Sequence, residues 1–156
     1  MGTRADKAVS RFMRGYNCAQ AVSSVFTEDT GVPEEIILRT AIGFGGGMGR
    51  TGGTCGAVSG AVIVIGLMAG STDPAEKEAK ELTYTLTQEF IERFTEKYGS
   101  VSCTALLGCD LSTREGSARA REENLTRTLC PGYIRDAVEI LEEVLTPITS
   151  RRPTTR

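Results

Sequence analysis

The residues of this chain best suited to chemistry are its five cysteines, because the sequence contains no histidine. Without histidine the chain cannot build a Ser-His-Asp triad, a Cys-His dyad, a histidine-based zinc protease site or a c-type haem attachment. A metal ion or cluster would have to be held by thiolates, carboxylates, backbone groups or an external ligand. The cysteines are Cys18, Cys55, Cys103, Cys109 and Cys130.

The spacing of the cysteines excludes the common local metal motifs. No two of them are in C-x-x-C spacing, and the nearest pair, Cys103 and Cys109, has five residues between them. A zinc knuckle and a ferredoxin-type run are therefore absent. Taken alone, this spacing favours buried structural thiols, because a free cysteine packs like a small hydrophobic side chain.

The position of the cysteines relative to the predicted helices favours functional thiols over structural ones. Cys55 is predicted at a helix start, Cys103 follows Ser102 at another, and Cys130 precedes Pro131 at a third. The partial positive charge of a helix N-terminus lowers the pKa of a thiol. Thiolates at such positions are suited to metal binding or to disulfide exchange.

A glycine-rich segment precedes Cys55. Residues 43–53 read GFGGGMGRTGG, in which seven of eleven are glycine, so the backbone can approach a ligand closely. The segment formally matches G-x-G-x-x-G, but no strand and no βαβ unit surround it, which argues against a dinucleotide site. Arg50 is either a solvated loop residue or a cation that stabilises a thiolate or an anionic cofactor near Cys55. The candidate cofactor contacts are Gly47, Gly49, Arg50 and Gly53.

The elements that must position these residues are predicted to be helices. Apolar residues recur at three- and four-residue steps, and no segment shows the alternation of a strand. We expect an all-α, single-domain bundle of five to seven helices over residues 1–150, with a disordered tail at 151–156. Helices are predicted at residues 3–27, 33–42, 55–69, 74–98, 103–107, 117–127 and 131–145.

The segment 55–69 is apolar on all sides, which is typical of a central helix in a bundle. Its apolar run of about 14 residues is shorter than the ~20 needed to span a membrane. Gly52, Gly56 and Gly60 are four residues apart and form a smooth ridge that another helix can approach closely. That helix belongs either to this chain or to a second copy in a homodimer.

The composition is that of an ordinary globular domain. The chain has 156 residues, 40% of them hydrophobic and 24% charged, with a formal net charge of −2. This charge argues against a nucleic-acid-binding surface, which needs clustered basic residues. The first residues lack the apolar core of a signal peptide, so we expect a cytoplasmic protein with reduced thiols and no membrane association.

Several blocks together resemble a known family. They are GYNCAQA from Gly15, the loop GFGGGMGR, CGAVSGA from Cys55, CTALLGCDLST from Cys103 and LCPGYIRDAVEILEEVL at the end. The chain is similar to the redox-active protein family named for its cysteine pattern C_GCAxxG_C_C, whose members are mostly prokaryotic. The resemblance aligns four cysteines with the pattern, namely Cys18, Cys55, Cys103 and Cys130.

The chain departs from the family pattern at two places. The family name puts alanine directly after the second cysteine, whereas here Gly56 intervenes before Ala57. Cys109 has no counterpart in the pattern, and we expect it to be an additional packing thiol.

The resemblance implies redox activity and leaves three hypotheses, without deciding whether the protein is an enzyme. In the first, Cys18, Cys55, Cys103 and Cys130 converge to hold an iron–sulfur cluster, or zinc in the same cage, and electrons pass to an unknown redox partner. In the second, no metal is bound and Cys55, Cys103 and Cys130 are thiol–disulfide redox residues. In the third, the protein is a non-catalytic, dimeric helical protein with structural cysteines.

Overall fold

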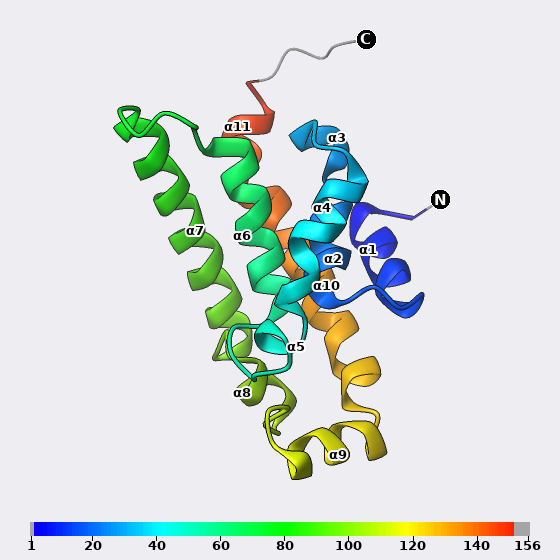
Figure 1. Cartoon of the computed structure of the whole chain (residues 1–156). Helices are drawn as coiled ribbons and strands as arrows, with labels where there is room; N and C mark the ends of the chain where they lie inside the picture. The colour runs from blue at the N-terminus through cyan, green and yellow to red at the C-terminus, as the bar shows by residue number, and fades with distance from the viewer. Residues whose placement is uncertain (1, 152–156) are drawn as a thin grey trace.

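The computed structural model describes residues 2–151 and is built from helices (Figure 1). Within this part of the chain there is no β-strand, and the one extended contact is an isolated antiparallel bridge between Thr54 and Ser102. The predicted all-α single domain is confirmed. Residues 152–156 of the predicted tail lie outside the described residues.

Seven helices in the described part have seven or more residues, as the prediction of five to seven allows, and the others are single turns. In chain order the elements are α1 (Arg4–Met13), α2 (Cys18–Ser24), α3 (Thr27–Thr30), α4 (Glu34–Ala41), the 3-10 turn η1 (Ile42–Phe44), α5 (Gly45–Met48), α6 (Gly56–Ala69), α7 (Lys77–Tyr98), α8 (Cys103–Leu107), α9 (Arg114–Glu122), α10 (Leu125–Val144) and α11 (Thr146–Thr149).

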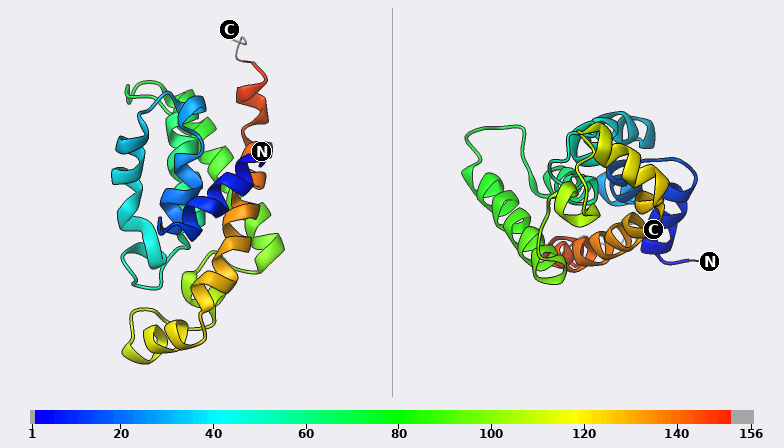
Figure 2. Two further views of the ribbon diagram at one scale, coloured as in Figure 1. Left: turned by 90° about the vertical axis from the view of Figure 1, so that its right-hand side faces the viewer. Right: turned by 90° about the horizontal axis from the view of Figure 1, so that it is seen from below.

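Helix α6 occupies the centre of the bundle, as its all-round apolar surface predicts (Figure 1). It packs against α2, α7 and α10, and α1 packs against α10. The core between these helices is built from fully buried side chains such as Phe26, Ile65, Phe90 and Leu141. Both views in Figure 2 show α9 at one end of the long helix α10, with α11 at the other end.

The single helix predicted over residues 3–27 is wrong, because the chain breaks into α1 and α2. Gly15 adopts a φ of +112°, which a glycine tolerates and which ends the helical path. Asn17 then caps α2: its side chain accepts a hydrogen bond from the Gln20 N–H at 3.0 Å, and the Gln20 side chain accepts one from the Asn17 N–H at 3.1 Å. Cys18 is therefore the first residue of a helix.

The predicted helix start at Pro131 is also wrong. Pro131 lies inside α10, which begins at Leu125 after Asn124, a residue in the left-handed conformation. A proline inside a helix removes one backbone hydrogen bond, but the buried face that α10 presents to the core continues through it. Cys130 is consequently a mid-helix residue and does not benefit from a helix N-terminus.

Two further boundaries differ from the predicted ones because side chains cap other turns. The Asp73 carboxylate accepts a hydrogen bond from the Ala75 N–H at 2.9 Å, which closes a separate turn before α7 begins at Lys77. Thr113 caps α9 by accepting from the Gly116 N–H at 2.9 Å, so this helix starts earlier than residue 117.

The predicted glycine ridge is used for a contact inside the chain. A Cβ atom at Gly60 would lie 2.7 Å from the carbonyl oxygen of Ala19, and one at Gly56 would lie 3.1 Å from the Cβ of Cys18. Both neighbours belong to α2, so α2 and α6 approach as closely as backbones allow. Because α2 covers this ridge, a homodimer stays a prediction that would need another surface.

We expect Gly60→Ala to destabilise the protein, because its new methyl group meets the backbone of α2. Overpacking of this kind costs about 1–3 kcal/mol, which exceeds the gain from replacing a helical glycine by alanine. The matched control is Gly66→Ala on the same helix, where a Cβ meets nothing within 4 Å, so a gain of about 0.5–1 kcal/mol is expected. Urea unfolding measures both, and equal effects would contradict the close-packed contact.

Candidate functional site

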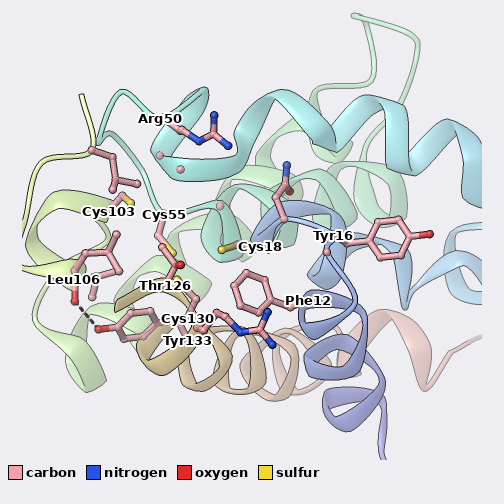
Figure 3. Close-up of a pocket in the computed structure, with 18 residues that line it drawn as sticks. Phe12, Tyr16, Cys18, Arg50, Cys55, Cys103, Leu106, Thr126, Cys130 and Tyr133 are labelled. Carbon is pink, nitrogen blue, oxygen red and sulfur yellow. Dashed lines mark hydrogen bonds between the residues drawn. The ribbon is translucent and has the colours of Figure 1, made fainter. Parts of the chain in front are cut away.

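The four cysteines of the family pattern meet in one pocket, which has a volume of about 370 Å³ (Figure 3). They come from four different helices: Cys18 begins α2, Cys55 is the residue before α6, Cys103 begins α8, and Cys130 lies in α10. All are free thiols, and the fifth cysteine, Cys109, is buried but does not line the pocket. The fold thus brings together residues that are far apart in the sequence.

A short backbone pairing fixes the backbone of Cys55 relative to that of Cys103. The Cys55 N–H donates to the carbonyl oxygen of Val101, and the Cys103 N–H donates to that of Gly53, both at 2.7 Å. These bonds flank the isolated bridge and join the starts of α6 and α8. No sequence pattern predicts this pairing, because it is too short to show strand alternation.

Cys18 lies against the start of α6 because residue 56 has no side chain. An alanine methyl group at this position would lie 3.0 Å from the carbonyl oxygen of Phe44 and 3.1 Å from the Cβ of Cys18. The neighbouring Asn17 side chain donates a hydrogen bond at 2.7 Å to the carbonyl oxygen of Ile42. The departure of Gly56 from the family name therefore has a steric reason.

The expectation of low-pKa thiols at helix starts is wrong for the metal-free protein. Burial, and secondarily the nearby Cys18, raises the pKa of Cys55 to about 12, although N–H groups of Ala57 and Val58 act to lower it. Burial, followed by the proximity of Cys55, likewise raises the pKa of Cys103 to about 12. Both thiols therefore stay protonated at neutral pH.

The other two thiols form a pair. The hydrogen bond between Cys18 and Cys130, together with burial, raises the pKa of Cys18 well above its ordinary value. Crowded thiols resist ionisation because each thiolate disfavours the next one, and a bound cation reverses this preference. The pocket is thus suited to neutral thiols without metal and to thiolates with it.

These shifts predict that the reduced, metal-free protein loses stability above pH 9. Because the folded pKa of Cys55 is about 12, against an ordinary value of 9.0, the folded state keeps a proton that the unfolded state loses. The stabilisation is complete below pH 9 and falls by up to about 1.4 kcal/mol per pH unit for each such thiol as the pH rises toward 12.

Urea unfolding between pH 8 and 10.5, with chelator and reductant, measures this dependence. Lysine and tyrosine titration is common to all variants, so the comparison is with Cys55→Ser, whose slope should be shallower. Identical slopes for the two proteins would contradict the raised pKa.

The glycine-rich segment approaches the cysteines at one residue in particular. A Cβ at Gly47 would lie 2.6 Å from the backbone nitrogen of Gly53 and 2.7 Å from the Cβ of Cys103. Of the four predicted cofactor contacts, Gly47 and Arg50 line the pocket. Gly49 and Gly53 do not line it, although the Gly53 carbonyl oxygen holds Cys103.

The pocket also contains side chains that the sequence did not single out. Arg127 lines it from α10, and Phe12 lines it from α1. Tyr133 donates a hydrogen bond at 2.7 Å to the carbonyl oxygen of Leu106, which ties α10 to α8 (Figure 3). Burial and then the nearby thiols, led by Cys130, raise the pKa of Tyr133. These residues carry no local motif, so only the fold reveals them.

The pocket offers thiol donors to a metal ion or a cluster. Among the described residues, no three Cys, Asp or Glu side chains are arranged to hold one metal ion. A cluster distributes its ligands over several iron atoms, and four thiolates are the usual set for [2Fe–2S] and [4Fe–4S] clusters. The described lining residues supply four thiols and no carboxylate.

Within residues 2–151, no helix combines the length and the apolar character that crossing a bilayer demands.

Comparison with known proteins agrees with the cysteine pattern. A family model described as "Putative redox-active protein (C_GCAxxG_C_C)" matches residues 16–144, a range that contains all four pocket cysteines. No curated protein and no solved structure matches the chain. Because the match covers most of the sequence, this protein belongs to the C_GCAxxG_C_C family of redox-active proteins.

Proposed function

We propose that this protein binds an iron–sulfur cluster through Cys18, Cys55, Cys103 and Cys130 and transfers electrons to a partner protein in the cytoplasm. The observation that carries the proposal is the convergence of these four thiols, from four helices, on one pocket. When bound, such a cluster supplies one-electron chemistry, with a potential set by charge, hydrogen bonds and solvent exposure.

The residues around the thiols support this function in distinct ways. Backbone hydrogen bonds fix Cys55 and Cys103, so two ligands are in place before a metal binds. The missing side chains of Gly47 and Gly56 keep the backbone close to the sulfur atoms. The guanidinium group of Arg50, which lines the pocket, offsets the negative charge of four thiolates.

Iron, zinc and acid-labile sulfide per chain, measured with a visible spectrum on protein purified without oxygen, test the proposal. Iron and sulfide in near-equal amounts are expected. Zinc alone would replace the redox role by a structural one. A metal-free protein with five titratable thiols, even after anaerobic reconstitution with iron and sulfide, would refute the cluster.

Thiol–disulfide chemistry is the second candidate, and the Cys18–Cys130 hydrogen bond favours it. The pair differs from the pairing of Cys55 with Cys103 or Cys130 that the sequence suggested. In this reading a mild oxidant such as oxidised glutathione removes two electrons and two protons from the two thiols as their disulfide forms. Mass mapping of the oxidised, metal-free protein should find Cys18 joined to Cys130, and five unmodified thiols would contradict it.

A further inference from the structure

We propose that the mouth of the cysteine pocket binds a small anion, either a carboxylate or an inorganic oxyanion, between Arg50 and Arg127. A redox role for this ligand, as the substrate, rests on the proposed function. Its binding depends on the two arginines alone. Anion binding can therefore be tested separately from cluster binding.

Arg50 is an exposed cation held at the pocket by an unusual backbone. Its side chain makes no hydrogen bond and no ion pair with any described residue. Its φ is +64°, in a run where residues 46–50 are all left-handed, and its N–H donates to the Gly45 carbonyl oxygen at 3.2 Å. A glycine would adopt this conformation without strain, so the arginine side chain is kept at a cost in stability.

Arg127 supplies a second cation from another element. It lies in the first turn of α10, is exposed, and also makes no ion pair within residues 2–151. Figure 3 shows Arg50 on the opposite side of the cysteines from Phe12 and Tyr133, the latter on α10. Two elements that are distant in sequence thus bring one guanidinium group each to the same pocket.

No carboxylate neutralises this pair inside the pocket. The described lining residues include two arginines and neither Asp nor Glu. Asp110 lies by Gly52 of the loop and already accepts hydrogen bonds from the backbone and hydroxyl groups of Ser112 at 2.9 and 2.6 Å. The two guanidinium groups therefore face the pocket without an acidic lining side chain beside them.

The shape of the site favours a small molecule. Its volume of about 370 Å³ lies within the range of small-ligand pockets, roughly 300–1,000 Å³. The guanidinium fork binds carboxylates and oxyanions through two parallel hydrogen bonds. Binding of an acidic peptide with no binding of small anions would instead indicate a protein-docking site and would overturn the proposal.

Isothermal titration of the full chain, purified without oxygen, with inorganic phosphate and with malonate tests the site. We expect saturable binding of one anion per chain. Arg50→Gln and Arg127→Gln should each weaken it at least tenfold. Arg121→Gln on α9 is the matched control, because Arg121 is exposed, makes no ion pair in the described structure and lies outside the pocket. Equal weakening by this control, or no binding of either probe, would overturn the proposal.

Two additional variants separate folding and cluster effects from anion binding. Arg50→Gly removes the strain of a left-handed non-glycine residue, so it should raise the unfolding temperature. It should still weaken anion binding tenfold, because the guanidinium group is lost. An unchanged affinity for the anion in this variant would contradict the role of Arg50 in binding it. Cys55→Ser should lose iron and keep arginine-dependent anion binding. A chain that binds iron but no anion refutes only this inference, and one that binds the anion but no iron refutes only the cluster.

Discussion

Single replacement of Cys18, Cys55, Cys103 or Cys130 by serine should abolish or nearly abolish cluster binding, whereas Cys109→Ser should leave it intact. The four thiols line one pocket, and the described lining residues include no histidine or carboxylate to take the place of a lost ligand. A serine hydroxyl is a much poorer ligand for iron than a thiolate, because it does not ionise at neutral pH.

Cys109 is a close control for the structural cost of these replacements. It is 8% exposed, against 7% for Cys103 and for Cys130, so a hydroxyl group is buried to nearly the same extent in these three variants. Iron and sulfide per chain report the cluster, and far-UV circular dichroism with urea unfolding reports the fold. Loss of iron from Cys109→Ser equal to that from the others would contradict the four-ligand assignment. So would a full iron content in any of the other four variants.

Gly47→Ala should damage both the fold and the cluster site. Gly47 has a φ of +68°, and an added methyl group would meet the backbone of Gly53 and the side chain of Cys103, both within 2.8 Å. The left-handed conformation costs a non-glycine residue about 1–2 kcal/mol, and the overpacking adds about 1–3 kcal/mol. Any relief of this clash displaces Cys103, so iron content should fall with stability.

Gly49→Ala separates the cost of the left-handed backbone from the cost of overpacking. Gly49 has a φ of +61°, but an added Cβ meets nothing within 4 Å. It should therefore lose only about 1–2 kcal/mol of unfolding free energy and keep its full iron content. Equal losses of stability and iron from the two variants would show that the contact of Gly47 with Gly53 and Cys103 has no role.

Local chemistry made much of the fold predictable from the sequence. The all-round apolar character of residues 55–69 placed α6 at the centre. Cys103 was expected at a helix start, and the side chain of the preceding Ser102 indeed accepts a hydrogen bond from the Ala105 N–H, at 3.4 Å. Gly99 and Gly108 end helices in the left-handed conformation, as glycines often do. Each of these features depends on residues a few positions apart, which the sequence displays directly.

The errors arose where distant parts of the chain decided the outcome. Pro131 is a good first residue for a helix, yet packing of the α10 face against the core carries that helix through it. Gly15 and the Asn17 cap break the first helix, and the break lets α2 lie along Gly56 and Gly60 of α6. Helix periodicity alone contains neither constraint.

The sequence by itself determined the helical class, the family and the four cysteines that match the family pattern. The tertiary structure alone decided that Cys18, Cys55, Cys103 and Cys130 line one pocket, and that Arg127 joins Arg50 there. It also reversed the expected electrostatics. A helix N-terminus lowers a thiol pKa by local charge, but burial raises it by more, because removing water disfavours a thiolate from every direction. Burial is set by the whole fold, so no local pattern reveals it.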